Sequence, residues 1–158
     1  MASSTRQTAS PVYLSRRERG ETQTAAGTAA RYVGALALLA MAVIHLEQYL
    51  SADFYDIPTI GTLFLLNFIG GTVLALGLMS PLERPANGRF SPLVVLLALA
   101  GAAMAAVSIA FLLISEGTTL FGFHESNYRL AIVLALVFEG IAVLSLGSFA
   151  AARLRRER

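Results

Sequence analysis

The sequence predicts an all-α protein, a four-helix transmembrane bundle in which neighbouring helices run antiparallel. The chain of 158 residues is 56% hydrophobic and 14% charged, with a mean hydropathy of +0.66. So few charged side chains do not cover a water-soluble surface. Four apolar runs, at residues 32–50, 59–79, 93–115 and 130–152, each approach the ~20 helical residues that cross a bilayer. None alternates polar and apolar residues with period two, so strands are not expected.

Turn and capping signals separate the runs. Pro58 precedes the second run, and Ser91-Pro92 opens the third as an N-cap followed by proline in the first turn. The segment SPLERPANGR (80–89) between them is rich in proline and holds an Asn-Gly pair, which is typical of a loop.

The organisation expected from these signals has three parts. Residues 1–30 are polar, rich in Ser, Thr and Ala, and show no regular apolar face, so we expect a flexible cytoplasmic arm there. Residues 31–152 form the bundle, and residues 153–158 form a basic cytoplasmic tail. The chain has no cysteine, which excludes disulfides, thiolate metal sites and cysteine nucleophiles.

The arginines predict the orientation of the bundle. All twelve basic residues are arginine, and eleven lie before the first run, in the 80–89 loop or after the fourth run; Arg129 is the exception. By the positive-inside rule, both termini lie in the cytoplasm. A composition rich in Arg, Ala, Leu and Gly is typical of GC-rich bacteria, so we expect a multi-pass protein of a bacterial plasma membrane. Nucleic-acid binding is excluded, because the arginines flank apolar runs instead of forming one patch.

Three polar residues interrupt the apolar runs. Glu139 lies ten residues past Arg129, about 15 Å along a helix and near the bilayer centre. An acid there costs about 2.5 to 3.5 kcal/mol and should face the protein interior. Asn67 is expected at a similar depth, where a protonated Glu139 either bonds it as interhelical glue or serves as a proton relay or ligand site. His45 is expected to be shallower, on one helix face with Tyr49.

The outer connections supply the remaining candidates. The outer-face candidates for binding are Glu47, Tyr49, Glu116, His124 and Glu125. Histidine with carboxylate suits zinc, copper or iron, so His45, His124 and Glu116 are candidate metal ligands, although their spacing matches no metal signature. We expect both histidines to approach each other on the outer face. Topology alone also explains acidic outer turns, because that side excludes arginine.

Small residues predict where the helices touch. In lipid, helices associate through small residues and polar contacts, because lipid tails are as apolar as leucine. Residues at three-and-four spacing form such faces in the second, third and fourth runs: Asn67, Gly70, Gly71, Leu74 and Gly77; Ala98, Gly101, Ala102, Ala105 and Ser108; Tyr128, Ala131, Ala135, Glu139 and Ala142.

Two stretches carry a family resemblance. YDIPTIGTLFLLN (55–67) and LFGFHES (120–126) resemble elements of small four-span membrane proteins of actinobacteria. The overall shape is also similar to the DoxX-like four-helix membrane proteins, without their diagnostic motif. The resemblance implies a four-span bundle and nothing about its chemistry.

Three functions fit the sequence, which contains no recognised catalytic motif. The first is a non-enzymatic membrane subunit or binding module that packs in the bilayer against a membrane-protein partner or a second copy. The second is an outer-leaflet module that binds a metal or a quinone for redox chemistry; the sequence itself requires no cofactor. The third is a small transporter or proton path through Glu139. Convergence of His45, Asn67 and Glu139 on one site would favour the second or third function.

Overall fold

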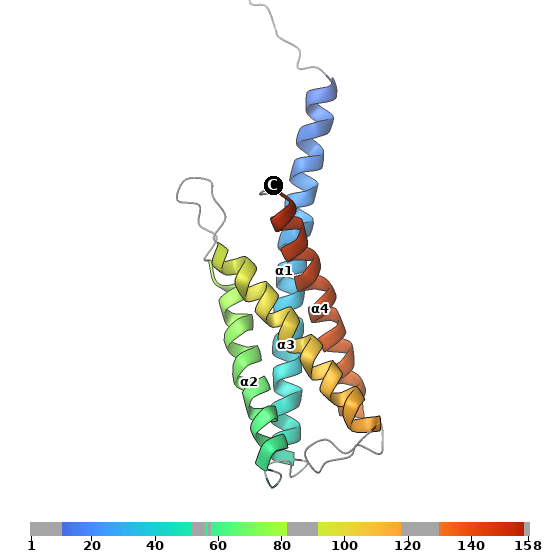
Figure 1. Ribbon diagram of the computed structural model, residues 1–158. Helices are drawn as coiled ribbons and strands as arrows, with labels where there is room; N and C mark the ends of the chain where they lie inside the picture. The colour runs from blue at the N-terminus through green and yellow to red at the C-terminus, as the bar shows by residue number, and fades with distance from the viewer. Residues whose placement is uncertain (1–10, 52–55, 57, 82–91, 118–129, 157–158) are drawn as a thin grey trace, which may run out of the picture.

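The computed structural model describes residues 11–51, 56, 58–81, 92–117 and 130–156, with side chains placed for all of these except 11–24, 58, 116 and 117. They form four helices, α1 (Pro11–Ser51), α2 (Pro58–Met79), α3 (Pro92–Gly117) and α4 (Leu130–Arg156), shown in Figure 1. All four are long and apolar enough to cross a membrane. The predicted all-α, four-helix fold is therefore confirmed.

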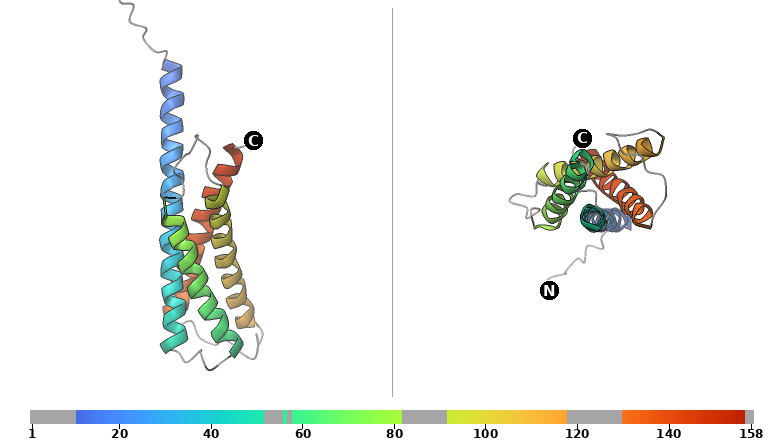
Figure 2. Two further views of the ribbon diagram at one scale, coloured as in Figure 1. Left: turned by 90° about the vertical axis from the view of Figure 1, so that its left-hand side faces the viewer. Right: turned by 90° about the horizontal axis from the view of Figure 1, so that it is seen from below.

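The membrane-spanning parts agree with the predicted runs, but α1 extends far beyond its run. The candidate spans are Ala25–Ser51, Thr59–Met79, Pro92–Ser115 and Leu130–Arg156. Helix α1 begins at Pro11 and projects past the bundle (Figure 2), so residues 11–30 are helical where a flexible arm was expected. Proline suits the first turn of a helix, and the Arg, Glu, Gln and Ala residues that follow are good helix formers. These preferences outweigh the lack of an apolar face.

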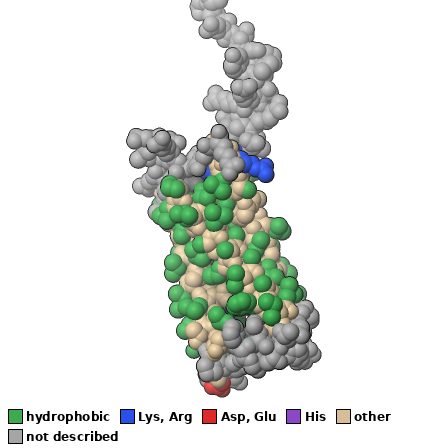
Figure 3. All heavy atoms as spheres, in the orientation of Figure 1, with side chains coloured by type: hydrophobic (Ala, Val, Ile, Leu, Met, Phe, Trp, Pro, Cys, Tyr) green, Lys and Arg blue, Asp and Glu red, His purple; other side chains and the backbone are tan. Residues whose placement is uncertain are grey.

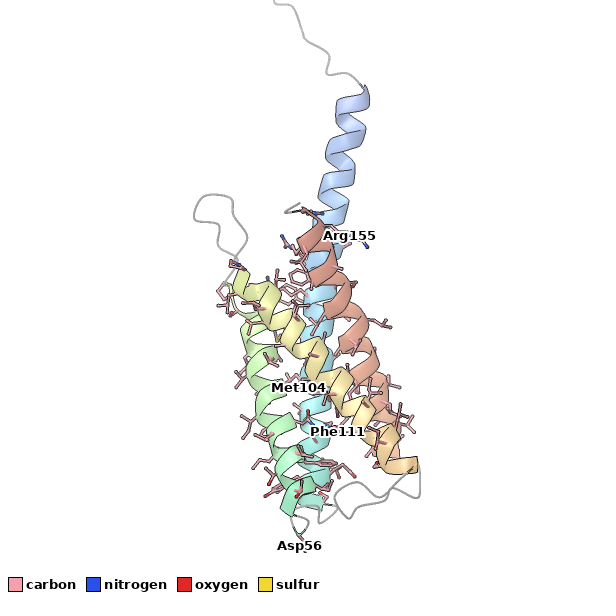
Figure 4. The ribbon with its side chains drawn as sticks, viewed as in Figure 1. Asp56, Met104, Phe111 and Arg155 are labelled. Carbon is pink, nitrogen blue, oxygen red and sulfur yellow. The ribbon has the colours of Figure 1, made fainter. Side chains whose placement is uncertain are left out.

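The helices form an antiparallel ring. Helix α1 packs mainly against α4 and α2. Helix α3 packs mainly against α4 and less against α2. Helices α2 and α4 do not contact each other. The N-terminus of α1 and the C-terminus of α4 lie toward one end of the bundle (Figure 1). Arg155 marks this end, which we call the arginine end, and Asp56 marks the opposite, acidic end (Figure 4). On the face that Figure 3 shows, hydrophobic side chains are spread over the surface between the two ends, as contact with a bilayer requires.

The bundle interior contains three layers of residues. Each helix contributes one residue to each layer, and these residues are seven positions apart. The His–Glu layer lies toward the acidic end, the glycine layer lies in the middle, and the arginine layer lies at the arginine end. Taken from α1 to α4, the His–Glu layer contains His45, Phe64, Ser108 and Glu139. The glycine layer contains Leu38, Gly71, Gly101 and Leu146. The arginine layer contains Arg31, Leu78, Val94 and Arg153. A seven-residue repeat keeps one face of each helix toward its neighbours, as in other antiparallel bundles.

The glycine layer is closed and apolar. A methyl group at Gly101 would lie 2.6 Å from Leu38 Cδ1 and 3.0 Å from Leu146 Cδ1. One at Gly71 would lie 3.1 Å from Ala42 Cβ and 3.3 Å from the Leu38 carbonyl oxygen. Leu38 and Leu146 are fully buried. The two glycines thus let α2 and α3 lie close to the bundle axis, where the side chains of Leu38 and Leu146 fill the space.

The arginine layer ties α1 to the end of α2. Arg31 Nε donates to the Leu78 carbonyl oxygen at 2.7 Å, and Arg31 Nη2 donates to the Ser80 carbonyl oxygen at 3.1 Å. The last carbonyls of a helix have no partner within that helix, so the guanidinium completes the C-terminus of α2. Arg153, the first residue of the predicted basic tail, is instead buried in α4, with its guanidinium 5.2 Å from the centre of the Phe149 ring.

Candidate functional site

His45 is held in one orientation by its own helix. Its Nδ1 lies 2.9 Å from the backbone carbonyl oxygen of Met41, one turn earlier in α1. A carbonyl oxygen only accepts hydrogen bonds, so Nδ1 carries the hydrogen and donates it. In the neutral imidazole the other nitrogen, Nε2, is then an acceptor. It faces away from α1, toward α3 and α4.

Glu139 and Ser108 meet this nitrogen. Glu139 Oε1 lies 3.8 Å from His45 Nε2, and Ser108 Oγ lies 3.4 Å from the same atom. Glu139 is 1% exposed and His45 is 6% exposed. A histidine, a hydroxyl and a carboxyl therefore share one site inside the membrane-spanning bundle.

Phe64 of α2 closes the remaining side of the site. Its ring centre lies 5.1 Å from that of His45, with an angle of 49° between the two planes. Each of the four helices thus contributes one side chain to the His–Glu layer. The aromatic wall holds the imidazole against α3 and α4 without offering a competing hydrogen-bonding group.

Glu139 faces the protein interior, as expected, but its expected bond to Asn67 is not formed. Within the described residues no hydrogen bond joins the two side chains, and Asn67 is half-buried on α2. The prediction of this bond is wrong because α2 and α4 do not contact each other in the bundle. Glu139 instead turns toward α1 and α3, and its Oε2 is buried without a hydrogen-bond partner among the described residues.

Depth in the membrane, which pointed to Asn67, was a poor guide to the neighbour of Glu139. Position along the helices places His45 nearer the acidic end than Glu139, in keeping with the shallower position expected for His45. Helical side chains lean toward the N-terminus of their own helix. Because α1 and α4 are antiparallel, His45 leans toward the arginine end and Glu139 leans toward the acidic end. The two side chains consequently meet.

Of the predicted outer-face candidates, only Glu47 and Tyr49 have described side chains, and the contacts described for His45 and Glu139 involve neither of them. Glu47 is exposed and accepts a hydrogen bond from Gln48 Nε2, while Tyr49 is half-buried. Glu116 belongs to α3, but its side chain, like His124 and Glu125, lies outside the described residues. No group of three or more histidine or acidic side chains in the described part could hold a metal ion. The predicted approach of His45 and His124 remains a prediction.

Ser108 and Phe64 are site residues that sequence reasoning missed. Ser108 was expected only as part of a small-residue face, among alanines and a glycine. A usable signal was its spacing of seven residues from Gly101, matching the seven between Leu38 and His45 and between Glu139 and Leu146. A shared heptad register would have placed all three polar groups in one layer.

No family model, curated protein or solved structure matches this chain. The chemistry of the His–Glu layer is therefore the basis for a functional assignment. The layer combines a group that gains positive charge on protonation with one that gains negative charge on deprotonation, and a hydroxyl that both donates and accepts lies beside them. Such a set binds and exchanges protons.

Proposed function

We propose that this four-span membrane protein is a non-enzymatic binding module whose site is the His–Glu layer and whose ligand is a proton. The observation that carries the proposal is the 3.8 Å approach of His45 Nε2 to Glu139 Oε1 in the buried centre of the bundle. Ionisable residues are expensive inside a membrane and usually mark a functional path or site. Two that face each other across helices are costly to bury even as a pair, so their presence points to a role beyond packing.

The arrangement of the three side chains supports a route for a proton within the site. In the proposed route the Glu139 carboxyl passes its proton to Ser108 Oγ, and the Ser108 hydroxyl passes its own proton to His45 Nε2, 3.4 Å away. Passing one proton along this chain breaks the carboxyl O–H bond and forms an Nε2–H bond, and Ser108 ends with the hydroxyl it began with. A neutral acid and imidazole become a carboxylate and an imidazolium, so the net charge of the site is unchanged. Because the two charges form side by side, their attraction offsets part of the cost of creating them in a low-dielectric interior.

The glycine layer favours binding over conduction through the bundle. Its four residues, Leu38, Gly71, Gly101 and Leu146, offer no side-chain donor or acceptor. They lie two turns from the His–Glu layer, about 10 Å toward the arginine end. A proton held at Glu139 thus has an apolar barrier on that side and exchanges toward the acidic end.

Two other functions have weaker support. A proton path or small transporter through Glu139 would use the same His–Glu layer, but it needs a polar route past the glycine layer. A metal or quinone module would need ligands beyond His45 and Glu139, because structural zinc sites use four protein ligands and catalytic sites use three. Its candidates Glu116 and His124 have no described side chains.

Infrared spectroscopy of the full-length protein, titrated with acid in detergent, tests the proposal. We expect a protonated-carboxyl band from a water-excluded site, absent from Glu139→Gln and with a changed midpoint in His45→Gln. Glu47→Gln is the matched control, because Glu47 also carries a carboxyl group but is exposed. It lies on α1, the helix of His45, four residues before that helix ends. The proposal fails if folded Glu139→Gln and wild-type protein give the same carboxyl difference spectrum across the whole titration.

A further inference from the structure

A groove opens between α1 and α4 at the arginine end. Its volume is about 390 Å³, and small side chains of both helices form most of its floor. The lining residues are Ala26, Gly27, Ala30, Ser148, Phe149, Ala152, Arg155 and Arg156. Arg155 and Arg156 are exposed at its rim, and Figure 4 shows Arg155 at the end of α4 beside α1. We call this the headgroup groove.

A second groove follows the same pair of helices toward the middle of the membrane span. It measures about 460 Å³ and is wholly apolar in its side chains: Leu36, Leu39, Ala40, Val43, Ile44, Leu134 and Phe138. We call this the chain groove. Leu134, Phe138, Ala152 and Arg156 lie on one face of α4, since their spacings of four and fourteen residues are close to whole helical turns. The two grooves therefore share one side of the α1–α4 seam.

We propose that one anionic phospholipid binds along this seam, with its phosphate in the headgroup groove and an acyl chain in the chain groove. The arginine rim suits the phosphate, because one guanidinium group donates two parallel hydrogen bonds to phosphate oxygens. The apolar chain groove matches the tail. Ala30 and Ile44 are fourteen residues apart, which is about 21 Å of helix and matches one bilayer leaflet together with its headgroup region.

The charge and the space at the arginine end both favour this occupant. Basic pockets between transmembrane helices recognise anionic headgroups. Arg31 and Arg153 are buried within the bundle, whereas Arg155 and Arg156 face the groove. The groove has room because a methyl group added at Gly27 would meet no atom within 4 Å. A zwitterionic lipid would fill the same space, but its positive group would cancel much of the attraction.

Lipid titration of the full-length, delipidated protein in detergent tests the site. Dioleoyl-phosphatidylglycerol and dioleoyl-phosphatidylcholine share their chains and differ in net charge, so native mass spectrometry of the first bound lipid isolates the headgroup effect. We expect phosphatidylglycerol to bind more tightly. Each arginine near the surface is worth about fivefold in affinity, so Arg155→Gln with Arg156→Gln should lose roughly 25-fold for phosphatidylglycerol and little for phosphatidylcholine. Arg155→Lys with Arg156→Lys should retain part of the preference, because lysine keeps the charge and loses the paired geometry.

A pair of glycine variants tests the groove itself. Gly27→Leu places a side chain in the headgroup groove, whereas Gly147→Leu places one on another face of α4; a methyl group meets no atom within 4 Å at either position. We expect only Gly27→Leu to lose the preference for phosphatidylglycerol, with helicity by circular dichroism unchanged in both.

Four results would overturn the proposal. Equal binding of the two lipids to the wild-type protein would remove the role of charge. A preference that survives Arg155→Gln with Arg156→Gln would place the anion elsewhere. Stabilisation by inorganic phosphate alone, equal to that by phosphatidylglycerol, would show an anion site without a lipid. A protein dimer that disappears in Gly27→Leu, without bound lipid, would identify a second copy as the occupant.

Discussion

His45 Nε2 lies 3.8 Å from Glu139 Oε1, although the two residues come from the first and last helices of the chain. The contact exists because α1 and α4 are antiparallel neighbours and their side chains lean toward each other along the bundle axis. Ser108 of α3 lies beside the pair. Within the described bundle this is the one contact between a histidine and an acidic side chain.

A double-mutant cycle of His45→Gln and Glu139→Gln should show coupling between the two side chains. Interhelical polar contacts in membrane proteins contribute about 0.6 kcal/mol on average and up to about 1.7 kcal/mol, so we expect a coupling energy in this range. Denaturation of the detergent-solubilised protein measures it. Additive effects within the usual error of about 0.3 to 0.5 kcal/mol would show that the pair does not interact.

Replacing Glu139 alone should separate shape from hydrogen bonding. Glu139→Gln keeps the volume and a donor, so the protein should fold with nearly unchanged thermal stability. Glu139→Leu leaves His45 Nε2 and Ser108 without this polar neighbour, and we expect a loss of about 1 to 3 kcal/mol. Thermal unfolding in detergent compares the two. A Glu139→Gln protein that fails to fold would show that the fold requires the ionised acid.

Gly101 should tolerate no larger side chain. Its added methyl group would lie 2.6 Å from Leu38 Cδ1, and Leu38 has little room to move because it is fully buried. Overpacking of this kind costs about 1 to 3 kcal/mol, so Gly101→Ala should lower the free energy of unfolding by that amount. Gly147→Ala is the matched control, since a methyl group there meets no atom within 4 Å. It should stabilise the helix by up to about 1 kcal/mol.

Arg31 should contribute to stability through the end of α2. Hydrogen bonds that involve a charged group are worth about 1.5 to 3 kcal/mol, so Arg31→Ala should destabilise the protein by at least that much. Arg31→Lys should recover part of the loss, because lysine restores charge but not the two-pronged geometry. Arg155→Ala, on an exposed residue, should stay within about 0.5 kcal/mol when no lipid is added. Equal losses for Arg31→Ala and Arg155→Ala would contradict this role for Arg31.

The orientation predicted by the arginines is tested by reporter fusions. Alkaline phosphatase, which is active only outside the cytoplasm, should be inactive when fused after Arg158, and green fluorescent protein at the same position should fluoresce. The reason is the predicted cytoplasmic position of the arginine-rich end. High phosphatase activity after Arg158 would reverse the topology.

The sequence by itself determined the helices and their membrane character. Hydrophobic length located the spans, since a bilayer of fixed thickness demands about 20 apolar residues in each. Small-residue spacing also identified the buried face of α3, where Ala98, Gly101 and Ala105 are all buried. The burial of Glu139 followed from the cost of exposing an acid to lipid. Each of these properties depends on one helix and its solvent.

Only the tertiary structure decided which helices are neighbours, and with that the partner of Glu139. In a bilayer all faces of a span are apolar, so periodicity reveals little about which face meets which helix. Asn67 was the natural partner by depth, but it lies on α2, which does not contact α4. His45 became the partner because α1 is adjacent to α4 and the two helices run in opposite directions. The helical extension from Pro11 is different, because the proline start and the helix-forming residues that explain it are local features of the sequence.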